Sequence, residues 1–237
     1  RRLRLLPEKS RMNARLALAL FCLSLAPTAF AAENYDQLFE RALEAVDFEF
    51  HKAWAYTETR VDSEHVWVGR FDPRRPDNQR WQLLTIDNRT PTAKEMEEYQ
   101  EERAGDLSEN GDDDVEAMVE PDSVRLIEET AEYWLLGFDP DEDEHEMLEN
   151  FAATIRINKA GPYLEYIDLR TRSPIKPAMG IKLAKLITRF TFGPAVDGGP
   201  VVPLSTQVEV KGRAYLVISF DEQELFRNSD FEYAGEE

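Results

Sequence analysis

Trp54-Ala-Tyr-Thr-Glu-Thr-Arg-Val61 decides the fold class of this chain. Apolar and polar residues alternate along it, and they do so again in His65–Phe71 and Arg80–Ile86, which is typical of strands with one buried face. Only a short polar connection at Asp62-Ser63 separates the first two segments, and strands joined by so short a link must be antiparallel. The sequence therefore predicts a hairpin followed by a third strand.

The same pattern returns through the rest of the chain. Further hairpins are expected across Lys159-Ala-Gly-Pro162 and around Lys211-Gly212. The other predicted strands are Ser123–Glu129, Glu132–Phe138 and a closing segment, Phe226–Tyr233. Ile181–Phe192 fits a helical stripe as well as a strand, and we favour a strand with a bulge.

Helices are predicted at two or three places. Asn34–Phe48 has its apolar residues at helical spacing with acidic residues on the other face. Thr92-Ala-Lys-Glu95 is a capping box that starts a second helix, expected to reach about Arg103. Pro140–Asn150 could form a third, short helix. With about ten strands in mostly sequential hairpins, the chain should be an α+β protein in which a single strongly curved antiparallel sheet has helices packed against one face.

The first 31 residues predict export. A basic segment leads into the short apolar run Leu16–Leu25 and then Ala29-Phe30-Ala31, which is the order of a cleavable signal peptide. Met12 resembles the true initiator, although the start could also be Arg1. We expect a signal peptide over residues 1–31, a single domain over 32–237 that stays soluble in the periplasm, and no membrane span in the mature chain.

The composition is strongly acidic and argues against several classes of partner. The chain has 28 Lys and Arg against 47 Asp and Glu, with a formal net charge of −19. Such a charge repels nucleic acid and favours cationic partners. Gly105–Pro121 is acidic and poor in apolar residues, and it should be a mobile loop.

No motif in the sequence predicts catalysis or a cofactor. There is no Gly-x-Ser-x-Gly elbow, no phosphate-binding glycine loop and no His-Glu-x-x-His pair. We therefore expect no enzyme, no catalytic residue, no metal and no cofactor. A hydrolase with acids from distant strands, such as Glu58 and Asp168, is the weakest alternative, and no spacing supports it.

Aromatic residues crowd into the first five predicted strands. Since side chains alternate between the faces of a strand, several of these rings could share one face and line an apolar groove that binds a hydrophobic ligand. The candidate ligand-binding residues are Trp54, Tyr56, Trp67, Phe71, Trp81 and Trp134. The alternative is that the same rings pack beneath the helices as an ordinary core.

Gly69-Arg-Phe-Asp-Pro-Arg-Arg75-Pro76-Asp-Asn-Gln-Arg-Trp81 resembles a run in the periplasmic lipoprotein-carrier superfamily, the LolA/LolB-like proteins. Both have a glycine entering a strand, an Arg-Pro step and a tryptophan opening the next strand. The resemblance implies an unclosed half-barrel with helices on its concave face, forming a lid over a cavity for lipid or lipoprotein acyl chains. It also implies that Arg75 helps to fasten this lid. Asp72-Pro73 departs from the family pattern and interrupts the strand.

Two functions follow from these observations. The first is an exported binding protein that holds a hydrophobic or acylated ligand, such as a lipid or the acyl chains of a lipoprotein, without chemistry. The alternative is an acidic interaction or scaffold module with a packed core, whose partner is a cationic envelope protein.

Overall fold

The computed structural model describes residues 34–109, 119–120, 122–140, 150–215 and 218–235, which belong to one compact unit beginning at Asn34. The expected signal peptide, residues 110–118 and 121 of the acidic loop, and residues 141–149 of the expected third helix lie outside the described residues.

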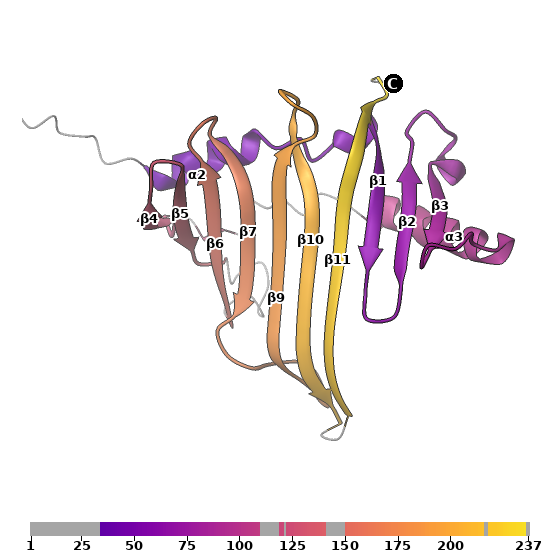
Figure 1. Cartoon of the computed structure of the whole chain (residues 1–237). Coiled ribbons are helices and arrows are strands. Elements are labelled where there is room, and N and C mark those ends of the chain that lie inside the picture. The colour runs from indigo at the N-terminus through magenta and orange to yellow at the C-terminus, as the bar shows by residue number, and fades with distance from the viewer. Residues whose placement is uncertain (1–33, 110–118, 121, 141–149, 216–217, 236–237) are drawn as a thin grey trace, which may run out of the picture. The chain divides into compact units, whose positions relative to one another are not determined.

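Eleven strands form one antiparallel sheet that is not closed into a barrel (Figure 1). They are β1 (Trp54–Val61), β2 (Val66–Phe71), β3 (Trp81–Ile86), β4 (Arg125–Glu129), β5 (Tyr133–Phe138), β6 (Phe151–Asn158), β7 (Tyr163–Thr171), β8 (Ile175–Ala178), β9 (Ile181–Pro194), β10 (Val201–Ala214) and β11 (Ile218–Tyr233). The spatial order is β3-β2-β1-β11-β10-β9-β7-β6-β5-β4, with β8 paired to β9. The predicted open antiparallel half-barrel is confirmed.

Helix α2 (Tyr35–Glu44) lies against the β5–β7 side of the sheet. The Asn34 side chain caps it, since its Oδ1 accepts from the backbone N–H groups of Asp36 at 3.1 Å and Gln37 at 3.4 Å. Its apolar stripe is buried and consists of Leu38, Phe39, Ala42 and Leu43. The helix thus follows the amphipathic pattern of the sequence.

Helix α3 (Ala93–Glu109) lies against β3 and the short 3-10 helix η3 (Asp77–Gln79). The predicted capping box is present: Thr92 N–H donates to Glu95 Oε2 at 2.7 Å, and Glu95 N–H donates to Thr92 Oγ1 at 3.3 Å. The helix continues past Arg103 and Gly105, where we expected it to end and the acidic loop to begin. Within the described ranges, no helix is long and apolar enough to cross a membrane.

Strand register defines the two faces of the sheet. Ile167 of β7 lies opposite Phe190 of β9, which lies opposite Thr206 of β10, and Thr206 lies opposite Phe226 of β11. Side chains of directly opposed residues point to the same face. Since Ile167 shares a core with α2, we call this the inner face and the reverse side the outer face.

Two separate cores hold the helices to the inner face. The first joins α2 to β5, β6 and β7 through residues such as Leu136, Ile155 and Leu164. The second joins α3 to β1, β2 and β3 and also contains Phe50 of the short 3-10 helix η2 (Phe50–Lys52). Strands β9, β10 and β11 separate the two flanks.

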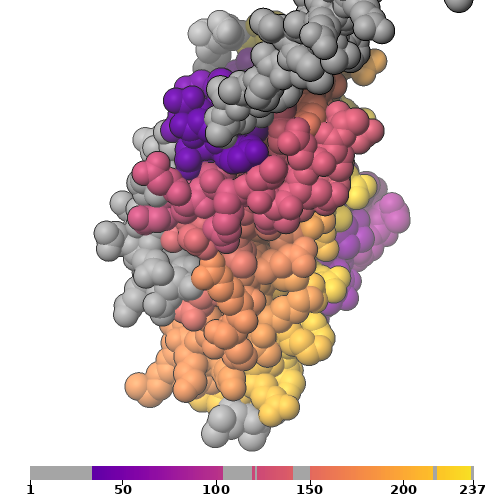
Figure 2. Space-filling view, turned by 90° about the vertical axis from the view of Figure 1, so that its left-hand side faces the viewer, coloured from indigo at the N-terminus to yellow at the C-terminus, as the bar shows by residue number. Residues whose placement is uncertain are grey.

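The last three strands are much longer than their neighbours and project beyond them (Figures 1 and 2). β10 and β11 pair from Ser205 and Arg227 to Ala214 and Ile218, whereas β1 pairs only with Leu225–Tyr233. β9 is a strand with a bulge against Lys211 and Gly212, as we predicted for Ile181–Phe192.

Candidate ligand-binding site

Four of the six predicted ligand-binding aromatics are packed into the second core. Trp54, Tyr56, Phe71 and Trp81 are each less than 10% exposed. The Tyr56 ring centre lies 5.2 Å from that of Phe71 and 5.7 Å from that of Trp81. The Trp81 ring is in turn covered by Tyr99 of α3, at 6.2 Å. These four rings are therefore packed as an ordinary core, which is the alternative to a ligand-binding groove.

Trp67 and Trp134 are half-buried and lie on opposite flanks of the inner face. The Arg60 guanidinium lies 5.3 Å from the centre of the Trp67 ring. The Lys159 ammonium lies 4.4 Å from the centre of the Trp134 ring. Because Trp134 packs against the first core and the other five rings belong to the second, the structure does not gather all six into one groove.

Between the helix-covered flanks runs a row of half-buried apolar side chains, which we call the inner strip. By register it lies on the inner face of β7 and β9–β11, and its members are Leu169, Leu186, Phe190, Val208, Val210 and Phe226. Thr188 and Thr206 interleave with them. Two carboxylates of β11, Glu222 and Glu224, lie at one side of the strip.

Buried charges fasten α3 beside this strip. Arg103 of α3 forms an ion pair with Glu58 of β1, and the two side chains are only 9% and 11% exposed. The Arg103 guanidinium also lies 4.8 Å from the Trp81 ring centre and 5.5 Å from that of Tyr99. A charge buried this deeply is stable only when paired, so the pair ties the helix to the sheet.

Arg60 links the helix to the inner strip. Its Nη1 donates to Glu102 of α3 at 2.9 Å, and its Nε donates to Glu224 of β11 at 2.6 Å. The guanidinium lies 5.3 Å from the ring centre of Phe226, a member of the strip. Burial alone would lower the pKa of Arg60, but the hydrogen bonds to the two carboxylates outweigh it and raise that pKa. Arg60 therefore stays charged at the strip's border.

The predicted lid residue Arg75 lies in the turn between β2 and β3. Its Nε is 3.8 Å from Asp72 Oδ2, and its side chain lies against the Gln82 amide. The contacts described for its side chain thus run to its own turn and to β3, while Arg103 and Arg60 make the charged contacts between α3 and the sheet. A role for Arg75 in fastening a lid stays a prediction.

The two acids of the weakest alternative, Glu58 and Asp168, lie on opposite faces. Glu58 is on the inner face beneath α3, whereas Asp168 faces outward and is hydrogen-bonded to Arg170 and Arg189. Each carboxylate is thus occupied by arginine. In the part of the chain that the structure describes, no group of three or more His, Cys, Asp and Glu could hold a metal ion.

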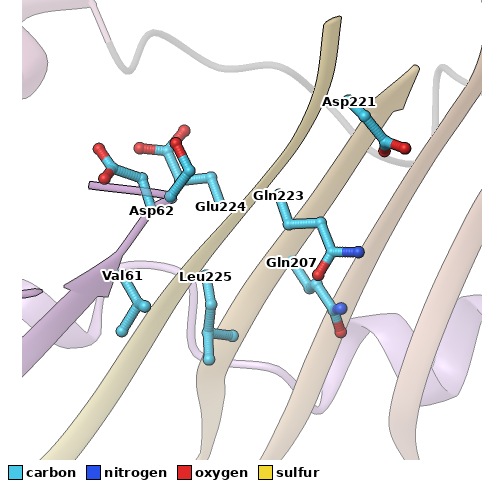
Figure 3. A pocket seen from close by; sticks show the side chains of 8 residues that line it. Val61, Asp62, Gln207, Asp221, Gln223, Glu224 and Leu225 are labelled. Carbon is cyan, nitrogen blue, oxygen red and sulfur yellow. The ribbon is translucent and has the colours of Figure 1, made fainter. Parts of the chain in front are cut away.

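An open hollow of about 520 Å³ lies where β1 ends beside β11 (Figure 3). Its lining residues are Val61, Asp62, Ser63, Gln207, Asp221, Gln223, Glu224 and Leu225. Three of these eight are carboxylates and none is Lys or Arg. The backbone N–H groups of Glu64 and His65 donate to Asp62 and hold the pKa of its carboxyl below the ordinary value. Glu224 is paired with Arg60 and Asp221 with Lys211, so Asp62 is the lining carboxylate for which the structure describes no ion pair.

No family model, no curated protein and no solved structure matches the chain. The evidence for its function is therefore the fold and the geometry described above.

Sequence reasoning missed most of the inner strip. Phe190, Val208 and Phe226 belong to long strands in which charged and apolar residues are mixed, so alternation does not show which face is the inner one. Pairing between β1 and β11, which brings Arg60 beside Phe226, joins segments far apart in the sequence. Arg60 lies two residues after Glu58 in the same strand, so the two side chains share a face of the sheet. This spacing could have identified Arg60 as a residue of the site.

Proposed function

We propose that this protein is an exported binding protein that holds a hydrophobic or acylated ligand on the inner strip and performs no chemistry on it. The observation that carries the proposal is the inner strip itself. Helices bury the inner face at both flanks, while the six apolar side chains of the strip, of which Leu169 and Phe190 also pack against the first core, are only half-buried. Apolar surface left partly open on the helix-bearing face of a curved sheet is a natural place for an apolar ligand.

The chemistry of the strip suits an acyl chain. Its apolar members are aliphatic side chains and two phenylalanines, and each methylene of a ligand that they bury contributes about 0.8 kcal/mol. Arg60, held by Glu102 and Glu224, offers a polar border for a ligand's head group. The sequence resemblance to lipoprotein carriers and the expected signal peptide agree with such a role in the periplasm.

The proposal is tested by mass spectrometry of lipids that co-purify with the protein from its native envelope. A quantitative arm uses a fluorescent fatty acid carrying a dansyl group, whose emission rises when it enters an apolar site. Val208→Lys, which places a charge in the strip, should weaken binding at least about tenfold, because burying an unpaired charge is costly. Gln207→Lys puts the same charge on the outer face of the same strand and should leave binding unchanged.

Equal binding by the two variants, or a native protein that carries no lipid and does not bind the probe, would overturn the proposal. Thermal unfolding of both variants shows whether each is folded. If Val208→Lys does not fold, Phe226→Ser with the control Leu225→Ser makes the same comparison on β11, since Leu225 lies on the outer face.

A further inference from the structure

We propose that the free edge of β11, from Ser219 to Gln223, binds an extended, basic segment of a partner polypeptide as an added β-strand. This surface lies beside the open hollow and does not depend on the inner strip.

The edge is long enough to hold a strand. β10 pairs with β11 from Arg227 down to Ile218, whereas the pairing of β1 stops at Leu225. Among the residues that the structure describes, no strand pairs with Ile218–Glu224 on the β1 side. At about 3.4 Å per residue, this leaves an open edge of about 24 Å. Exposed strand edges of this kind are templates for adding a strand from another chain.

A hydrogen-bonded turn sets the start of the open edge. Asp62 Oδ1 accepts from the N–H groups of Glu64 at 2.7 Å and His65 at 2.9 Å, and the Asp62 N–H donates to the His65 carbonyl at 3.1 Å. This turn reverses the chain into β2, so β1 cannot continue beside β11. The hollow lies at the point where β1 turns away (Figure 3).

Register identifies the backbone groups that face the edge. Because the Asp62 N–H points to β2, alternation directs the N–H and C=O of Val61 toward its partner Leu225 on β11, and those of Leu225 toward β1. Continuing along β11, the groups of Gln223, Asp221 and Ser219 also face the β1 side. An added strand collinear with β1 would therefore find these donors and acceptors in the register that β1 itself uses.

Charge selects a basic segment as the occupant. Asp62 lines the hollow and Glu222 lies on the edge, and no ion pair is described for either, whereas Asp221 pairs with Lys211 of β10 and Glu224 pairs with Arg60. Lysine or arginine side chains of an added strand would lie beside these acids. A second copy of this chain would instead oppose one acidic edge with another, and the chain's net charge of −19 adds to that repulsion.

The test uses the complete protein and a defined probe, a capped and fluorescently labelled nonapeptide of alternating lysine and valine. A matched peptide with proline in place of valine has the same charge but cannot pair as a strand. We expect the lysine–valine peptide to bind at least about tenfold more tightly in fluorescence anisotropy, and its binding to weaken as salt rises above about 0.1 M. Equal binding of the two peptides would overturn strand addition.

Variants of the protein locate the site. Gln223→Pro removes an N–H that faces the open edge and should reduce binding at least about tenfold, because proline is tolerated at strand edges yet blocks pairing. Asp221→Lys should have a similar effect through charge while leaving the backbone intact, and it serves if the proline variant does not fold. The control Asp197→Lys makes the same charge change at an exposed position in the β9–β10 turn and should bind normally.

Val208→Lys, which disrupts the inner strip, should also bind the peptide normally, so failure of this proposal and failure of ligand binding are distinguishable. Two further results would overturn the proposal. One is unchanged peptide binding by Gln223→Pro and Asp221→Lys. The other is a dimer of the native protein in light scattering that Gln223→Pro dissociates, since the edge would then be occupied by a second copy.

Discussion

The guanidinium of Arg103 lies 4.8 Å from the centre of the Trp81 ring while its Nη2 pairs with Glu58, so one side chain of α3 contacts both an aromatic core and a buried carboxylate. Replacement by methionine keeps much of the packing but leaves Glu58 as a buried charge without this partner. Arg103→Met should lower the free energy of unfolding by about 3 to 5 kcal/mol in urea denaturation.

Glu58→Gln combined with Arg103→Met should recover a large part of that loss, because no charge then remains to be buried. Lys94→Met is the control, since Lys94 forms an exposed pair with Glu98 on the same helix and should change stability by less than about 0.5 kcal/mol. If Arg103→Met unfolds at the same urea concentration as Lys94→Met, the ion pair does not anchor α3.

Gly69 leaves the space that Tyr99 of α3 occupies. A Cβ at Gly69 would collide with the Tyr99 hydroxyl and lie 2.9 Å from Cζ of that ring. Gly69→Ala should therefore push α3 away and destabilise the protein by about 1 to 3 kcal/mol, as overpacking does. Combining Gly69→Ala with Tyr99→Phe removes the hydroxyl and should restore part of the stability lost in Gly69→Ala. If thermal unfolding shows that the effects of the two substitutions simply add, the two residues are not in contact.

Asp168 should make stability depend on acidic pH. Burial would raise the pKa of its carboxyl, but hydrogen bonds from Arg170 and Arg189 outweigh burial and hold the pKa below the ordinary value. A carboxyl with a lowered folded-state pKa stabilises the fold above its unfolded value, near 3.9, and loses this contribution as pH falls through the folded value. Urea midpoints measured from pH 6 to pH 2 should fall most steeply below about pH 4.

Asp168→Asn should flatten that acid-side fall and lower stability at pH 6. Asp197→Asn, at an exposed position, is the matched control and should reproduce the native pH profile. A native profile in Asp168→Asn would show that this carboxyl does not supply the pH dependence.

The capping box of α3 is stabilised by a third residue. Arg89 donates to both Glu95 oxygens, at 2.9 and 2.6 Å, and these bonds, with those from Thr92, lower the pKa of Glu95 to about 2. Thr92→Ala should lower the free energy of unfolding by about 1 kcal/mol and Thr92→Ser by much less, since serine caps equally well. Equal urea midpoints for the two variants would contradict a capping role.

Local patterns predicted most of the architecture, but the hairpin expected around Lys211-Gly212 was wrong, because both residues lie inside β10 and pair with β11. The hairpin from Trp54, the Thr92 capping box and the strand with a bulge from Ile181 depend on neighbours in sequence, and the structure contains all three. α3 continues to Glu109, beyond its expected end near Arg103, and no local pattern contains the contact of Arg103 with Glu58. The candidate site is harder to predict for the same reason. The alternation of apolar and polar residues does not show that α3 covers Trp81 or that Val208 stays half-buried.

The pairing of Trp54 with Tyr233 has a consequence for the order of events in folding. Among the described strands, β11 is the one that joins β1 to the central sheet, so the three-stranded meander that begins at Trp54 cannot dock until the C-terminal strand has been synthesised. Contacts between such distant segments make folding slow compared with helical proteins. A chain built this way cannot complete its sheet until its last strand has been synthesised.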